Sequence, residues 1–179
     1  MSPRPRQASD AQLLEAAFRA IARLGPRRVT LADVAAEAGV SAAAIVQRFG
    51  SKRALLLAAA ADAASGHAYL FAAARARHRS PLRALYGVAD GLGVMGATRE
   101  AVAHSLAFLQ MDLEDPDFLA HARTGSRTFH TNLRALIAEA AAAGELVPCD
   151  AGRLARAVQA TLFGAILEWV IHGRGAMPV

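Results

Sequence analysis

The chain has 179 residues, of which 54% are hydrophobic and 20% are charged, a composition typical of one or two globular domains and not of a disordered chain. The longest uncharged apolar run, over residues 54–61, is far shorter than the roughly 20 residues that cross a bilayer, so we expect no transmembrane helix and no membrane partner. No apolar segment follows the first charged residues, and Cys149 is the only cysteine. We therefore expect a cytoplasmic protein without a secretory signal or an intrachain disulfide.

The positive charge of the chain is concentrated at its N-terminal end. Residues 1–53 contain nine Lys and Arg against four Asp and Glu, a net charge of +5. Residues 54–179 contain eleven residues of each sign and are neutral. A local positive field attracts polyanions, of which nucleic acid is the commonest.

Helical spacing of apolar residues runs through the whole chain. In residues 9–24, Leu13, Ala17, Ile21 and Leu24 share one helix face, and Gly25 follows as a stop signal. Start and stop residues predict seven further helices, over residues 30–39, 41–48, 51–77, 80–96, 98–112, 115–143 and 150–173. No segment has strand periodicity, so we predict an all-α protein with an N-terminal domain over 1–53 and a larger helical domain over 54–179.

Two of the short helices have the spacing of a helix-turn-helix. The small Ala35 allows the second helix to cross closely, and Gly39 permits a left-handed turn four residues later. Val40 and Ile45 are placed to hold the second helix against the first, while Ser41 caps its N-terminus. In a basic region, this motif predicts a DNA-binding head.

The residues TLADVAAEAGVSAAAIVQRFGSKRALL, from Thr30 onward, resemble the DNA-binding domain of the TetR family of bacterial transcription regulators. The resemblance extends from about Leu13 to Leu57. The segments LAFLQMDLEDPDF and LFGAILEW resemble pieces of the helical ligand-binding and dimerisation domain of that family. The resemblance implies a homodimeric, ligand-responsive regulator, expected to be a repressor that binds a palindromic operator and is released by a small apolar effector.

The resemblance also implies which residues bind DNA. Thr30 and Lys52 are expected to contact the phosphate backbone, and residues 41–47 to lie in the major groove. Gln47 is the best candidate for reading a base, because its amide can pair with adenine through two hydrogen bonds. The full set of predicted DNA-binding residues is Thr30, Ser41, Ala42, Ala43, Gln47, Arg48 and Lys52.

Three positions depart from the usual pattern of the family. Ala43 stands where Gly is common, Val46 where an aromatic residue is usual, and Arg48 where His is usual. Val46 cannot donate a hydrogen bond to phosphate. Arg48 is a candidate to replace that anchor, since a guanidinium pairs with phosphate through two donors.

In the second domain, apolar and amphipathic side chains are candidates for an effector pocket of mainly apolar character. The predicted ligand-binding residues are Met95, His104, Phe108, Met111 and Trp169. The dimer interface is expected on two apolar stripes that would form a four-helix bundle with a second copy. One stripe comprises Leu133, Leu136, Ile137 and Ala140, and the other Leu154, Val158, Leu162, Ala165, Ile166 and Trp169. Packing within one chain is the alternative.

No residue pattern predicts catalysis, a metal site or a cofactor. The six histidines form no i, i+4 pair, and the chain lacks a nucleophile-elbow motif. The letters of Gly91, Gly93 and Gly96 match a dinucleotide fingerprint, but a helix precedes them where that fingerprint needs a strand. The alternative to a repressor is a ligand-binding or scaffold protein whose helix-turn-helix has lost DNA binding, which the absence of an aromatic residue at Val46 favours.

Overall fold

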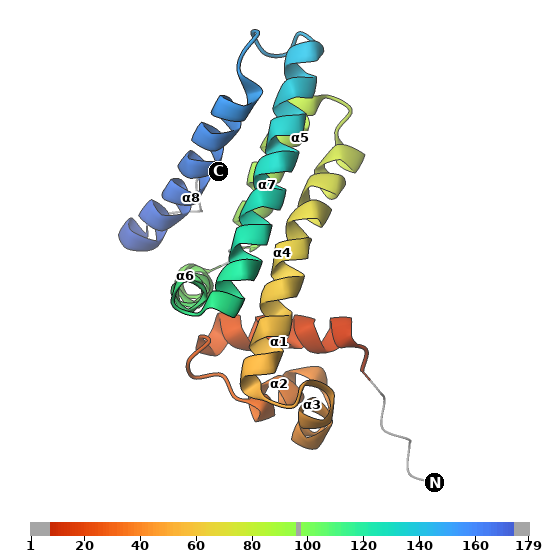
Figure 1. Cartoon of the computed structure of the whole chain (residues 1–179), viewed down its shortest axis with the longest axis vertical. Coiled ribbons are helices and arrows are strands. Elements are labelled where there is room, and N and C mark those ends of the chain that lie inside the picture. The colour runs from red at the N-terminus through yellow and green to blue at the C-terminus, as the bar shows by residue number, and fades with distance from the viewer. Residues whose placement is uncertain (1–7, 96–97, 174–179) are drawn as a thin grey trace. The chain divides into compact units, whose positions relative to one another are not determined.

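The computed structural model describes residues 8–95 and 98–173, and in these ranges the chain is helical with no strand. Figure 1 shows the helices in chain order. Their bounds are α1 Asp10–Leu24, α2 Leu31–Ala38, α3 Ala42–Phe49, α4 Lys52–Arg77, α5 Pro81–Met95, α6 Arg99–Glu114, α7 Pro116–Ala142 and α8 Ala151–His172. The predicted all-α fold is confirmed, and the eight predicted helices agree with these bounds to within a few residues.

The starts of the first three helices follow from local side-chain chemistry. Ser9 caps α1 in a capping box with Gln12, and Thr30 caps α2 in a capping box with Asp33. The Ser41 side chain accepts a hydrogen bond from the backbone N–H of Ala44 and caps α3. Each cap satisfies N–H groups that the first turn of a helix leaves without a partner.

The apolar faces of α1, α2 and α3 meet the start of α4 in one core. Leu13, Val34, Ile45 and Leu55 are almost fully buried there. Phe118 of α7 belongs to the same core. The short helices α2 and α3 are therefore held by tertiary packing, because eight-residue helices are not stable alone.

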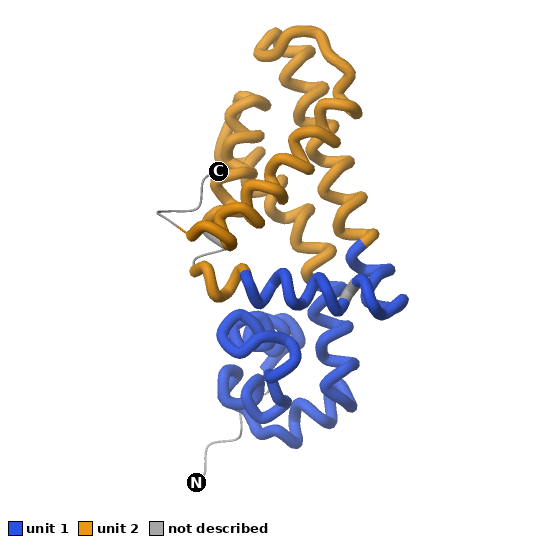
Figure 2. The backbone as a smooth tube through the Cα atoms, turned by 90° about the vertical axis from the view of Figure 1, so that its left-hand side faces the viewer, with its two compact units in different colours: residues 1–62, 103–122 blue, residues 63–102, 123–179 orange. Residues whose placement is uncertain are grey.

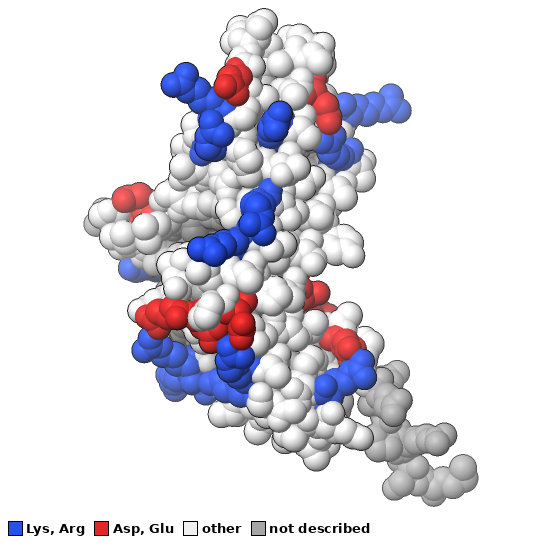
Figure 3. Space-filling model, in the orientation of Figure 1, with Lys and Arg blue, Asp and Glu red and all other residues white. Residues whose placement is uncertain are grey.

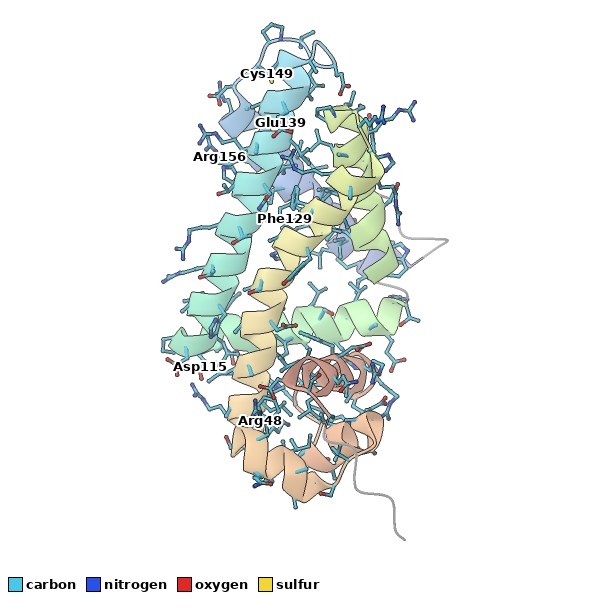
Figure 4. All side chains as sticks on the ribbon, turned by 90° about the vertical axis from the view of Figure 1, so that its right-hand side faces the viewer. Arg48, Asp115, Phe129, Glu139, Cys149 and Arg156 are labelled. Atoms are coloured by element: carbon cyan, nitrogen blue, oxygen red, sulfur yellow. The ribbon has the colours of Figure 1, made fainter. Side chains whose placement is uncertain are left out.

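A second core joins α4, α5, α7 and α8. Phe129 is completely buried on α7 and meets Phe71 of α4 edge-on, with ring centroids 5.1 Å apart. Figure 4 labels Phe129 among these helices. The Gly125 carbonyl of α7 accepts a hydrogen bond of 3.0 Å from Nδ1 of His67. A Cβ added at Gly125 would lie 3.2 Å from the Ala64 Cα, so α4 and α7 approach closely at this point.

The chain forms two compact units that do not follow one break in the sequence (Figure 2). Unit 1 comprises residues 1–62 and 103–122, and unit 2 comprises 63–102 and 123–179. The first unit thus contains the three N-terminal helices together with parts of α4, α6 and α7. The division into functional domains at residues 53 and 54 stays a prediction.

One of the two apolar stripes expected at a dimer interface is buried inside the chain. Leu133, Leu136, Ile137 and Ala140 are at most 1% exposed, and the first three belong to the core of unit 2. That part of the interface prediction is wrong, because these residues cover Phe71 and Val88 of their own chain. On α8, Leu154, Val158 and Leu162 also pack against this core. The large apolar side chains left exposed on α8 are Phe163, Leu167 and Ile171.

Two helices have the length and apolar composition of a membrane span, although the longest uncharged apolar run in the sequence, over residues 54–61, is short. The 18-residue windows in α4 and α8 have mean hydropathies of 1.3 and 1.4. Few charged residues interrupt the apolar sequence, so the mean hydropathy of each window stays high. One third of the α4 window is buried, but only 6% of the α8 window. The core helix of a globular protein passes the same test, whereas the low burial of α8 leaves an apolar face uncovered in the single chain.

Candidate nucleic-acid interface

The exposed face of α3 carries most of the predicted base-contacting residues. Ile45 is completely buried and fixes the rotation of the helix about its axis. The opposite side therefore exposes Ala42, Ala43, Val46 and Gln47. Among the described residues, the Gln47 amide has no hydrogen-bond partner, so its donors and acceptor are available to a base edge.

The turn before α3 brings its N-terminus to the surface. Gly39 has φ 67° and ψ 31°, the left-handed conformation that ends α2. The backbone N–H of Val40 then bonds to the Ala35 carbonyl at 3.0 Å. The Ser41 oxygen accepts from Ala44, but within the described part of the chain its hydroxyl proton has no acceptor. That proton is free to bind a phosphate oxygen.

Thr30 already uses its hydroxyl group in the cap of α2. The hydroxyl donates to Oδ2 of Asp33 at 2.6 Å and accepts from the Asp33 N–H at 3.2 Å. The hydrogen bonds from Thr30 lower the pKa of Asp33 below its usual value. A phosphate contact through the Thr30 hydroxyl proton would have to replace the one to Asp33.

Lys52 lies at the start of α4 and is anchored to the connection between α1 and α2. Its Nζ donates to the Arg27 carbonyl at 2.8 Å, which leaves two N–H groups of the ammonium for an anion. Arg27 and Arg28 are exposed, and their side chains have no partner among the described residues. The helix-turn-helix spacing did not single out these two arginines, although the local charge count included them.

Other cations of unit 1 are neutralised by carboxylates. Glu37 of α2 binds Arg23 at 3.0 Å and Arg19 at 3.5 Å. Arg53 bonds to Asp115 and Asp117 at 2.8 Å each. On the face drawn in Figure 3, blue and red side chains adjoin one another in the lower part of the picture. The +5 of residues 1–53 already includes Glu37, but Asp115 and Asp117 lie outside that segment, so their bonds to Arg53 lower the positive charge that is free to meet a phosphate backbone.

Arg48, the predicted replacement for the missing aromatic anchor, is paired with Asp10. Its Nε and Nη2 donate to the two carboxylate oxygens of Asp10, both at 2.5 Å. These bonds lower the pKa of Asp10 and raise that of Arg48. Sequence reasoning missed Asp10, because it lies 38 residues from Arg48 on a different helix.

An open hollow of about 1050 Å³ lies between the start of α1, the turn after α2 and the exposed side of α3. Three predicted DNA-binding residues, Ser41, Gln47 and Arg48, line it together with Ser9 and Asp10. The described residues contain no group of three His, Cys, Asp or Glu side chains placed to hold a metal ion. The hollow thus offers hydrogen-bonding groups and one arginine, which suit a phosphate or a base edge.

The predicted ligand-binding residues are divided between the two compact units. His104, Phe108 and Met111 belong to unit 1, where Phe108 and Met111 pack against the core that α1 to α4 form. The Nδ1 of His104 donates to the Ala22 carbonyl of α1 at 2.7 Å. Trp169 is half-buried on α8 in unit 2, and Met95 ends α5 with its side chain outside the described part. Their role in ligand binding stays a prediction.

Family models match both ends of the chain. The model described as bacterial regulatory proteins, tetR family, matches residues 13–59. The model described as BetI-type transcriptional repressor, C-terminal, matches residues 88–178, which is more than half of the chain. The first match contains all the predicted DNA-binding residues, from Thr30 to Lys52, but not Ser9 or Asp10.

A relative in sequence and several solved structures agree with these matches. The HTH-type transcriptional regulator BetI of Burkholderia lata is 30% identical over 96% of this chain and 90% of its own length. A transcriptional regulator from Saccharomonospora viridis in complex with choline has a TM-score of 0.77 and 23% identity, over 93% of this chain and 88% of that one. The regulator FadR of Bacillus subtilis in complex with stearoyl-CoA has a TM-score of 0.68 and 15% identity, over 94% and 91%.

Proposed function

The chain belongs to the TetR family of bacterial regulatory proteins, which are DNA-binding transcription regulators and not enzymes, and from this premise we propose that it is a cytoplasmic repressor. In this proposal a homodimer binds a palindromic operator and releases it when a small apolar effector binds. The BetI-type repressor model over residues 88–178 supports the direction of regulation.

The observation that carries DNA binding is a set of hydrogen-bond donors in unit 1 that have no acceptor among the described residues. Within the part of the chain that the structure describes, Gln47 has a free amide, Ser41 a free hydroxyl proton and Lys52 two free N–H groups. Ala42 and Ala43 add exposed methyl groups, which suit the thymine methyl. We assign base reading to Gln47 and the two alanines, and phosphate binding to Thr30, Ser41, Arg48 and Lys52.

The exposed apolar face of α8 supports the homodimer. Phe163, Leu167 and Ile171 repeat every four residues and are 42%, 46% and 54% exposed. Large apolar side chains in such a row are typical of a helix that packs against a partner. A second copy of the chain presents the same face, so an isologous contact through α8 would bury both.

Effector binding is assigned to the helical domain over residues 54–179. Choline is bound to the regulator from Saccharomonospora viridis, and stearoyl-CoA to FadR of Bacillus subtilis, so relatives of this fold take ligands of different chemistry. Choline and a long-chain acyl-CoA are therefore the first two compounds to test on the protein–DNA complex. Release of the duplex by one of them at a concentration that leaves the fold intact would identify the effector class.

The test of DNA binding is selection of bound duplexes from a random pool, with Lys52→Ala and Gln47→Ala beside the parent. We expect an enriched palindrome, weaker binding of all sequences by Lys52→Ala, and altered base preference with Gln47→Ala. Arg77→Ala is the matched control, because it removes a positive charge at the far end of the same helix. At 1.5 Å per residue, the two ends of α4 lie about 38 Å apart. No enrichment at low salt would contradict the proposal.

Val46 favours a second candidate, a protein that binds ligand but has lost DNA binding. This apolar side chain is 47% exposed in the middle of the α3 face. A salt titration separates the two candidates, because neutralised phosphates make affinity fall steeply as salt rises. A flat response, or no binding at 50 mM salt, would favour the second candidate.

A further inference from the structure

Asp10 and Arg48 form a two-point contact between the first residue of α1 and the last turn of α3. Nε and Nη2 of Arg48 each donate to a different oxygen of Asp10. Both side chains are about half exposed, at 59% for Arg48 and 49% for Asp10. The pair therefore lies at the surface, where a third group can reach it.

The geometry of the pair leaves one edge of the guanidinium unused. Arginine has five N–H groups, of which Asp10 takes the Nε–H and one from Nη2. The remaining three include the pair on Nη1 and Nη2 that binds a phosphate through two parallel hydrogen bonds. Arg48 has no other partner among the described residues, so this edge is open.

The Asp10–Arg48 pair lies next to the residues that face DNA in the proposed function. Arg48 follows Gln47 and lines the same hollow as Gln47 and Ser41. A lone carboxylate at this place would repel a phosphate. The pair is neutral, so Asp10 contributes no attraction by its charge, and what it supplies is the orientation of Arg48.

We propose that Asp10 is a positioning residue for DNA binding, which holds Arg48 by one edge so that its other edge meets a backbone phosphate. This inference rests on the proposed function. Val46 cannot bind a phosphate, and in this inference Arg48 of α3, held by Asp10 of α1, makes that contact instead.

The substitution Asp10→Asn tests the inference through the sign of its effect. Removing a negative charge beside DNA strengthens binding if only the net field matters. If Asp10 positions Arg48, binding of the duplex selected by the parent becomes weaker, by about threefold or more, since the charge-assisted pair is lost. Glu15→Gln is the matched control, because it removes an equal charge from α1 without touching Arg48 and should not weaken binding.

Substitutions at Arg48 identify the partner through which Asp10 acts. Arg48→Ala should reduce the salt slope by about 0.9 for each head, the value for one phosphate contact. Arg48→Lys keeps the charge but loses the fork and should also weaken binding. In the Arg48→Ala background, Asp10→Asn should cause no further loss. Circular dichroism and thermal unfolding show whether each variant is folded.

The outcomes separate failure of this inference from failure of the proposed function. If the parent selects a palindrome and Asp10→Asn binds it as tightly or more tightly, the inference is overturned and the repressor stands. An equal loss from Asp10→Asn with and without Arg48 would overturn it too. If the folded parent selects no duplex, the proposed function and the inference both fail.

Discussion

Thr30 and Asp33 show how much one residue pair determines at the start of a helix. The two side chains bond to each other and to each other's backbone N–H, which satisfies the first turn of α2. We predict that Thr30→Ala lowers the free energy of unfolding by about 1 kcal/mol, the usual value for loss of an N-cap. Thr30→Ser keeps the acceptor oxygen and should lose much less. Urea denaturation of both variants measures the difference, and equal losses would contradict the role of the cap.

His67 makes stability depend on pH through its burial between two helices. Desolvation lowers the pKa of His67 below its usual 6.5, although the hydrogen bond to Gly125 opposes this. The folded state therefore binds fewer protons than the unfolded state just below pH 6.5. Stability from this group falls as pH drops from about 6.5 toward the lowered pKa.

His67→Gln is expected to flatten that dependence. The free energy of unfolding, measured between pH 7.5 and 5.0, should decline less with acid in this variant than in the parent. His172→Gln is the control, since this histidine is exposed and close to Glu168. A parent and a His67→Gln variant with the same pH dependence would show that His67 does not cause it.

At the scale of helices, Gly125 sets how closely α4 and α7 pack. A Cβ at this position would press on the Ala64 backbone and on the His67 ring, both 3.2 Å away. We predict that Gly125→Val destabilises the fold by about 1–3 kcal/mol through overpacking. Gly66→Ala on α4 is the control, because no atom lies within 4 Å of its added Cβ. Its better helix propensity should stabilise by up to about 1 kcal/mol.

The same elements explain which helices depend on the rest of the molecule. The eight-residue α2 and α3 contribute Val34 and Ile45 to a core that α1 and α4 complete. Their sequence marks their ends, but packing keeps them helical. Thermal unfolding followed by circular dichroism would measure the two changes predicted above, the loss of stability from Gly125→Val and the gain from Gly66→Ala.

For the whole molecule, α8 is a helix on which the single chain leaves a row of three large apolar side chains exposed, Phe163, Leu167 and Ile171. We predict that Leu167→Glu converts the proposed dimer into a monomer, because two carboxylates would be buried opposite each other across an isologous contact. Val147→Glu is the matched control, since Val147 is 80% exposed in the connection before α8. Analytical ultracentrifugation distinguishes the two states. A parent that sediments as a monomer, or a Leu167→Glu variant that remains a dimer, would contradict the assignment of α8.

The dimer prediction also bears on DNA binding. Two heads bind a palindrome more tightly than one, because the second contact is intramolecular once the first has formed. A monomeric Leu167→Glu variant should therefore lose affinity for the full operator but retain weak affinity for a half-site. Fluorescence anisotropy with both duplexes measures the two affinities. If Leu167→Glu binds the full operator and the half-site with equal affinity, the result agrees with a monomer.

The sequence by itself determined the features that depend on residues close together in the chain. The cap at Ser41, the left-handed turn at Gly39 and the order of the eight helices involve partners within about four positions, where the backbone fixes the geometry. The family also followed from a local motif, because a helix-turn-helix is defined by spacing within one short segment.

Only the tertiary structure decided which side chains are free and which are already bound. Asp10 reaches Arg48 across 38 residues, and Lys52 reaches the Arg27 carbonyl across 25. His104 bonds to the Ala22 carbonyl of α1 across 82 residues, and the Leu133 stripe is core where an interface was expected. An apolar or charged residue looks the same in a sequence whether its partner is its own chain, a second copy or DNA. The distances between helices far apart in the chain make that choice.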